Sequence, residues 1–133
     1  MKTAFDIVQD VRSLINVSEL LNQIDGQIYP FVKPSNSTKQ DITVSVLSAN
    51  NEQIQEATVN IRIHSPNLNG SLPDSEHYDK ISKIICTLTD AQYREFFHTE
   101  VFEPGRVYRD ENGKHVCLVQ LDYYSIQSNY KNI

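Results

Sequence analysis

The chain has 133 residues, 39% of them hydrophobic and 22% charged, with a formal net charge of −5 and a pI of about 5.3. We expect a single domain over residues 1–133, because a chain of this size buries enough surface to fold without a disulfide or a metal ion. The twelve Lys and Arg are scattered along the sequence. Composition therefore argues against a protein that holds nucleic acid through a basic patch.

The two cysteines and the N-terminal residues indicate the cellular compartment in which we expect the protein. Cys86 and Cys117 stand far apart in apolar surroundings, which favours two free buried thiols in a reducing compartment. Charges interrupt the first residues, MKTAFDIVQDVRS, too early for a signal peptide, and no apolar run approaches membrane length. We expect a soluble protein, cytoplasmic in whatever cell makes it.

The first 41 residues predict helix followed by an extended segment. Apolar residues recur at helical spacing over 4–15 and again over 20–24, which predicts two short helices or one kinked helix. The break falls at 16–18, where Asn16 and Glu19 have the spacing of a capping box. The run that follows, IYPFVKPSNSTKQD, contains two prolines and many polar residues, which indicates a connector or an edge segment and not a central strand.

The middle of the chain predicts two strands and a helix. Alternation of apolar and polar residues predicts strands over 42–48 and 57–64, followed by the polar loop 65–73. Asp74 or Ser75 can cap the next helix. Its inner stripe is Tyr78, Ile81, Ile84, Ile85 and Leu88.

The last section predicts a short helical piece over 91–97 and then a long hairpin. Strands are expected over 99–109 and 114–126, joined at Asn112-Gly113, the dipeptide that best suits a type I′ turn. The predicted fold is α+β, a mostly antiparallel four-stranded sheet with helices packed on one face, in the order α-β-β-α-β-β.

His64 and His77 are the residues that most invite a chemical interpretation. Zinc sites usually contain a close ligand pair such as H-x₃-H or C-x₂-C, and these histidines are thirteen positions apart. Glu76 and Asp79 share a helix face, but carboxylates in a first turn also serve the helix dipole. No nucleophile elbow or phosphate-binding glycine loop occurs. We expect no catalytic residue, metal or cofactor, and a small enzyme or ligand-binding domain using His64, His77 and Glu76 stays as the minor alternative.

Several segments together resemble the tail-terminator and tail-completion proteins of long-tailed bacteriophages. A helix runs into IDGQIYPFVKP, two strands follow as ITVSVLS and ATVNIRIHS, and the second leads through a loop into DSEHYDKISKIICTLTD. The stretch VYRDENGKHVCLVQLDYYSI looks like the closing hairpin of that family. The match covers most of the chain and depends on the order and spacing of these segments.

The resemblance implies a structural protein of the virion without enzymatic activity, made in the cytoplasm of the host bacterium. Such proteins form homohexameric rings that cap the tail tube and provide the surface on which the head is joined. The implied partners are further copies of the chain, the tail-tube protein and a head-completion or connector protein, and DNA would pass through the ring without specific binding. Another neck or head-completion ring protein of a phage is the main alternative.

Two polar segments are the expected contact regions, the loop 65–73 and the hairpin tip 110–114, because partner-binding residues often lie on such loops. A small sheet also has exposed edges that a ring of subunits could cover. The candidate contact residues, for a partner or a neighbouring subunit, are Arg62, His64, Asn67, Asn69, Asp110, Glu111, Asn112 and Lys114.

Overall fold

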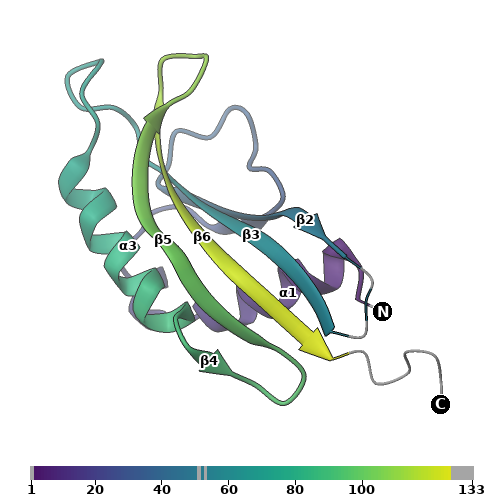
Figure 1. The fold of residues 1–133 in the computed structure, drawn as a ribbon. Coiled ribbons are helices and arrows are strands. Elements are labelled where there is room, and N and C mark those ends of the chain that lie inside the picture. The colour runs from purple at the N-terminus through teal and green to yellow at the C-terminus, as the bar shows by residue number, and fades with distance from the viewer. Residues whose placement is uncertain (1, 51, 53, 127–133) are drawn as a thin grey trace, which may run out of the picture.

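The computed structural model describes residues 2–50, 52 and 54–126 and shows a sheet with helices packed against it (Figure 1). The helices and strands are α1 (Ala4–Ile15), α2 (Ser18–Leu21), β1 (Ile28–Pro30), β2 (Asp41–Ala49), β3 (Ile54–His64), α3 (Ser75–Thr89), β4 (Gln92–Tyr93), β5 (His98–Arg109) and β6 (His115–Ile126).

The sheet has six strands in the order β1-β2-β3-β6-β5-β4 and curls into a half-barrel (Figure 1). β1 runs parallel to β2, whereas every other neighbouring pair is antiparallel. β5 contains two register irregularities, between Val101 and Glu103 and between Glu103 and Arg106. Such bulges bend a strand and increase its twist, which allows the long hairpin to curve.

The prediction of a four-stranded, mostly antiparallel sheet in the order α-β-β-α-β-β is therefore wrong, although the fold is α+β. Ile28–Pro30 forms a parallel outer strand, with Ile28 opposite Ile42 and Pro30 opposite Val44. Pro30 lacks an N–H, which an outer strand tolerates. A second short strand, Gln92–Tyr93, replaces the helical piece expected over 91–97.

The core lies between one face of the sheet and the helices. α1 and α3 both bury an apolar stripe, which in α3 includes Tyr78, Ile81 and Ile85. The inward residues of the strands alternate as a pleated sheet requires, for example Val59, Ile61 and Ile63 in β3. The inward members of the neighbouring strands are Ile42 and Val44 in β2 and Cys117, Val119, Leu121 and Tyr123 in β6.

The helix starts are set by side-chain hydrogen bonds in two of the three cases. Thr3 and Asp6 form a capping box at α1. Asp74 caps α3 by accepting from the His77 N–H, which confirms one of the two expected caps. The capping box expected at Asn16 is wrong, because Val17 occupies the N-cap of α2 and makes no side-chain cap.

The hairpin tip differs from the type I′ turn that Asn112-Gly113 predicts. Gly113 has a φ of +79°, but Asn112 does not have a positive φ. Asp110 accounts for the difference, since its Oδ1 accepts the N–H groups of both Asn112 and Lys114 at 2.9 Å. Residues 111–113 therefore form a three-residue loop that ends in a left-handed glycine, one of the common hairpin connections.

Both cysteines are free thiols, as expected. Cys117 is buried in β6, and burial raises the pKa of its thiol to about 11. Cys86 is half-buried and its thiol donates to the Pro104 carbonyl at 3.2 Å. In the part of the chain that the structure describes, no helix has the length and apolar character needed to cross a bilayer.

Candidate functional site

Three segments far apart in the sequence meet at one end of the sheet, which we call the apex (Figure 1). They are the connector 33–39, the start of the loop 65–73 and the hairpin tip 110–114. The Asn67 amide joins the last two: its Nδ2 donates to the Gly113 carbonyl at 3.1 Å, and its Oδ1 accepts the His115 N–H at 3.2 Å. These bonds fix the spacing between loop and hairpin.

A cavity of about 380 Å³, the apex cavity, lies between these segments. Its lining is polar with a few apolar groups. The lining residues are Lys33, Ser37, Thr38, Lys39, His64, Ser65, Pro66, Asn67, Gly70, Asp110, Asn112, Gly113, Lys114, His115 and Val116.

The structure brings five of the eight predicted contact residues together at this cavity. These five are His64, Asn67, Asp110, Asn112 and Lys114. The other three lie outside it: Asn69 and Glu111 are exposed on the two loops, and Arg62 lies on the sheet.

Two lysines of the connector were missed by the sequence-based prediction. Lys33 and Lys39 line the cavity beside Lys114. Their position depends on β1, which pairs in parallel with β2 and so places the connector beside the hairpin tip. In the sequence, residues 33–39 are only a mainly polar run before the next strand, and this pattern does not indicate which part of the protein they face.

The charges around the apex cavity are unevenly paired. Among the described residues, Lys33, Lys39 and Lys114 have no carboxylate within 4 Å. Asp110, the only carboxylate of the lining, is engaged by two backbone N–H groups. Asp41, fully buried nearby, accepts from the Gln27 N–H at 3.0 Å and from the Ser37 hydroxyl at 2.5 Å. The lining is therefore cationic, although the whole chain is acidic.

His64 is held neutral at this site. Burial, together with the nearby Lys33, lowers its pKa to about 4 against the opposing effect of Asp41. Its Nε2 lies 3.1 Å from the Thr43 hydroxyl. His77 does not line the cavity; burial lowers its pKa as well, and its charged neighbours are Asp74, Asp25 and Lys80. The two histidines therefore occupy different surroundings.

Glu76 and Asp79 provide no acid–base pair in the structure. Both are exposed on α3, and Asp79 pairs with Lys83 at 2.9 Å on the surface of that helix. Within residues 2–50, 52 and 54–126, no group of three or more His, Cys, Asp or Glu could hold a metal ion.

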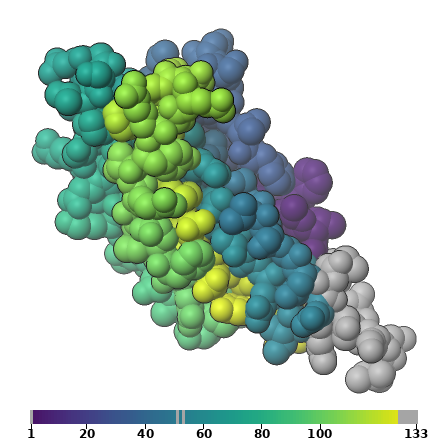
Figure 2. Space-filling model, turned by 45° about the horizontal axis from the view of Figure 1, so that its top comes forward, coloured from purple at the N-terminus to yellow at the C-terminus, as the bar shows by residue number. Residues whose placement is uncertain are grey.

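The face of the sheet opposite the helices, which we call the open face, is polar. Figure 2 shows β6 (yellow) between β5 (green) and β3 (blue) with no helix over them. Arg62 is its central side chain; it donates to the Tyr108 hydroxyl and to the Ser45 hydroxyl, each at 3.1 Å. The Gln120 amide donates to Asn60 at 2.8 Å. Arg62 thus has a structural role in joining β2, β3 and β5.

Two groups of exposed apolar side chains lie at opposite edges of the sheet, whereas other exposed apolar residues, such as Leu47, Leu68 and Phe102, belong to neither group. The Phe5 patch, beside β1, consists of Phe5, Phe31 and Val32; Phe5 and Val32 are 71% and 76% exposed, and the Phe5 and Phe31 rings meet edge to face at 5.2 Å. The Tyr93 patch, beside β4, lines a surface hollow of about 690 Å³. Its apolar members are Ile54, Tyr93, Phe96 and Ile126.

The outermost strands of the sheet are short, and some of their polar groups are satisfied within the chain. β1 has three residues, and its Ile28 carbonyl accepts from Arg12. β4 has two residues, and beyond it the Val101 N–H donates to Asp90 at the end of α3. Beyond these two short strands, the outer sides of β2 after Val44 and of β5 after Thr99 pair with no described strand, so both edges also carry unpaired backbone.

Comparison with known proteins gives no further guide, since no family model matches the chain and no curated protein matches its sequence.

Proposed function

We propose that the chain is a ring-forming structural subunit of the tail-terminator type, which caps a phage tail tube and joins it to the head. The observation that carries this proposal is the pair of apolar patches on opposite edges of one small domain. Large exposed apolar patches usually mark sites of protein association. The Phe5 patch and the Tyr93 patch differ in composition, so contact between them would be head-to-tail.

Head-to-tail contacts close into a ring when the rotation between neighbours divides a full turn, and otherwise they make a filament. The resemblance to tail terminators supports the closed ring, with six copies. In this proposal the two patches join neighbouring subunits, and the loop 65–73 and the hairpin tip 110–114 remain for the tail-tube and head-completion proteins. The ring belongs to the virion, and DNA passes through it.

The association is tested with one charged substitution in each patch. Phe96→Asp alters the Tyr93 patch and Val32→Asp alters the Phe5 patch, whereas Leu47→Asp is the matched control, because Leu47 is equally exposed and belongs to neither patch. Light scattering and negative-stain microscopy of the wild type, alone and with purified tail tubes, should show rings. Each patch variant should lose them, and the control should keep them.

Mixing the two patch variants tests the head-to-tail geometry. Each variant keeps one intact patch, so the mixture should form a dimer that cannot grow, while each variant alone stays monomeric. A wild type that remains monomeric both at high concentration and on tail tubes would refute the ring. A mixture that reassembles full rings would refute the pairing of these two patches.

A further inference from the structure

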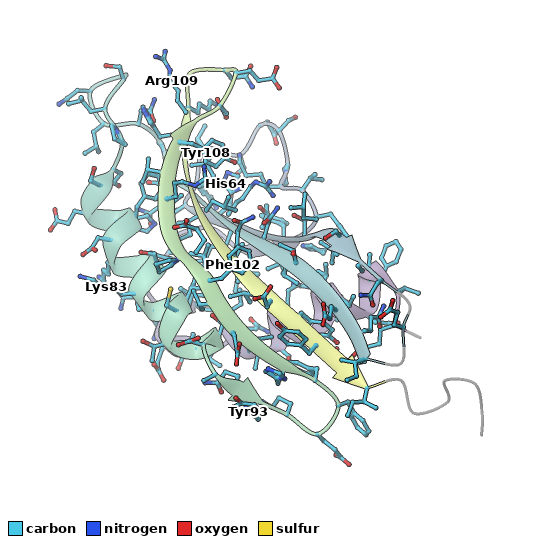
Figure 3. All side chains as sticks on the ribbon, viewed as in Figure 1. His64, Lys83, Tyr93, Phe102, Tyr108 and Arg109 are labelled. Atoms are coloured by element: carbon cyan, nitrogen blue, oxygen red, sulfur yellow. The ribbon has the colours of Figure 1, made fainter. Side chains whose placement is uncertain are left out.

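The apex cavity concentrates positive charge in a chain whose net charge is −5. Three of the twelve Lys and Arg, Lys33, Lys39 and Lys114, line this one cavity. A fourth cation, Arg109, lies behind the hairpin tip, where its guanidinium would be 3.2 Å from a Cβ at Gly113. Figure 3 shows Arg109 and His64 at this end of the molecule. Like charges placed together repel one another, so they destabilise the fold unless a counter-charge binds between them.

The carboxylates nearby supply only part of that counter-charge. Asp110 and Asp41 are both engaged by N–H or hydroxyl donors, which leaves the three lysines without an ion pair among the described residues. Of the three ammonium groups, only that of Lys33 makes a hydrogen bond with a described residue, from its Nζ to the Ser37 carbonyl at 3.1 Å.

The site also contains neutral hydrogen-bonding side chains, and hydrogen bonds hold its walls in position. The side chains of Thr38 and Asn112 line the cavity and make no hydrogen bond with the described residues, so both are available to a ligand. Asn67 ties the loop to the hairpin, and Asp41 ties the connector to β1. The walls are held in place without a ligand, so binding would require little ordering of the chain.

We propose that the apex cavity binds a phosphate group, from a nucleotide or from a nucleic-acid backbone. Three ammonium groups and one carboxylate leave a formal charge of +2, which matches a phosphate dianion. The lysines come from two separate segments on different sides of the cavity, and a tetrahedral group can present oxygens to several sides at once. A planar carboxylate presents its two oxygens in one plane and would leave part of this lining unused.

The cavity volume agrees with this ligand class. At about 380 Å³ it falls in the lower part of the size range of small-molecule sites, which leaves room for part of the molecule that carries the phosphate. This site does not involve either apolar patch, so it is independent of ring formation.

Titration calorimetry of the full chain with pyrophosphate, with ATP and with a short single-stranded oligonucleotide tests the proposal. The test variant is the double substitution Lys39→Gln and Lys114→Gln, two exposed side chains that take no part in packing. Lys83→Gln is the matched control, because Lys83 is an exposed lysine on α3, away from the apex (Figure 3). Thermal melts of each variant check that the fold is kept.

We expect saturable binding of pyrophosphate that weakens with salt and falls at least about tenfold in the double variant, with the control unchanged. Binding of ATP without the oligonucleotide would assign the phosphate to a free nucleotide, and binding of the oligonucleotide, lost in the double variant, would assign it to a nucleic-acid backbone. Absence of saturable binding for all three probes, equal loss in Lys83→Gln, or tighter binding of a pentaglutamate peptide than of pyrophosphate would overturn the proposal.

Discussion

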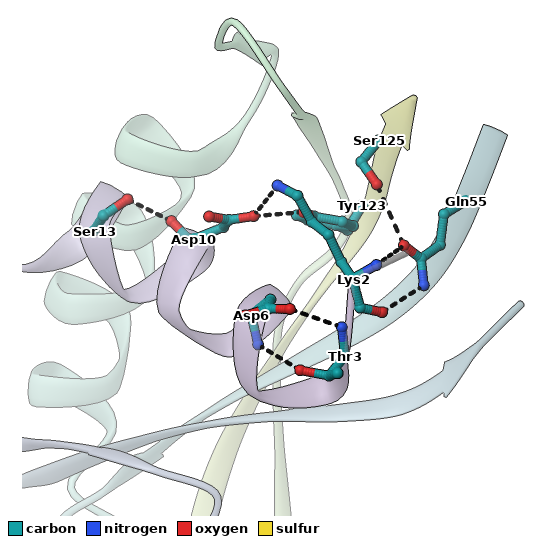
Figure 4. Close-up of polar contacts among 8 residues, drawn as sticks. All are labelled: Lys2, Thr3, Asp6, Asp10, Ser13, Gln55, Tyr123 and Ser125. Carbon is teal, nitrogen blue, oxygen red and sulfur yellow. Dashed lines mark hydrogen bonds and ion pairs between the residues drawn. The ribbon is translucent and has the colours of Figure 1, made fainter. Parts of the chain in front are cut away.

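Tyr123 donates a hydrogen bond of 2.6 Å to the Asp10 carboxylate and so ties the last strand to the first helix (Figure 4). Lys2 pairs with the same carboxylate at 2.5 Å, and its ammonium lies over the Tyr123 ring at 5.8 Å. The Lys2 backbone is fixed in turn by the buried Gln55 amide. The start of the chain is therefore anchored to β3 and β6 by polar contacts beneath α1.

Tyr123→Phe should lower the free energy of unfolding by about 1–3 kcal/mol, because the substitution removes a hydrogen bond to a charged group and leaves the half-buried Asp10 carboxylate with one partner fewer. Urea denaturation measures the change. Tyr93→Phe is the control, since the Tyr93 hydroxyl is on the surface and has no hydrogen bond among the described residues. Equal stability of the two variants would show that the Asp10 bond is without net effect.

Gly26 lies against the connector so closely that a side chain cannot fit. A Cβ there would be 2.1 Å from Asp41 Oδ1 and 2.4 Å from the Gln40 carbonyl oxygen. Gly26→Ala should therefore destabilise the fold by about 1–3 kcal/mol or more, by displacing the buried Asp41 carboxylate from its donors. Gly70→Ala is the comparison: nothing lies within 4 Å of its Cβ position, and only its φ of +81° opposes the change. We expect the midpoint of thermal unfolding to fall further for Gly26→Ala.

Asn67→Ala should loosen the hairpin tip without unfolding the domain. The substitution removes the bonds to the Gly113 carbonyl and the His115 N–H, each worth about 1 kcal/mol. Hydrogen exchange followed by mass spectrometry should show faster exchange over 110–116. The control is Asn36→Ala, because Asn36 is an exposed connector residue whose side chain makes no hydrogen bond with the described residues. Unchanged exchange in the Asn67 variant would mean that other contacts hold the tip.

Acidification should destabilise the protein partly through His64. Its pKa is about 4 in the folded chain and 6.5 in the unfolded chain, so between these values the unfolded state binds a proton that the folded state does not. The stabilisation is complete above pH 6.5 and is lost as the pH falls toward 4, at most about 1–2 kcal/mol after allowance for solvent screening. His77 acts in the same direction, because burial lowers its pKa as well.

Substituting His64 by Gln should flatten this dependence. Urea midpoints measured across this pH window for His64→Gln and for the wild type should converge at the acidic end. Parallel curves would show that His64 is not the group responsible.

Several features of the fold follow from local patterns in the sequence. The helical spacing of Ile7, Val8 and Val11 and the alternation of Val59, Ile61 and Ile63 place these side chains in the core, as the structure confirms. The cap at Asp74 is also local, because a carboxylate before a helix satisfies its first N–H groups. These predictions succeed because each depends on residues within a few positions of one another.

The two missed strands have no comparable local pattern. β1 is three residues long and β4 two, which is too short for alternation to be recognised. Each exists because a longer strand beside it offers free backbone groups, Ile42 to Val44 for β1 and His98 to Thr99 for β4. Likewise, Asp110 changed the turn type at Asn112 by bonding to backbone groups that the dipeptide rule does not consider.

By itself the sequence determined the α+β class, the two main hairpins, the helix between them and the polar character of the loop 65–73 and the tip 110–114. Only the tertiary structure decided that these loops meet the connector around one cationic cavity, and that two groups of exposed apolar side chains lie at opposite edges of the sheet. The physical reason is the sequence separation of the interacting residues. Periodicity and capping depend on residues close together in the sequence, whereas a cavity or a patch is made by side chains from segments that are far apart in the sequence.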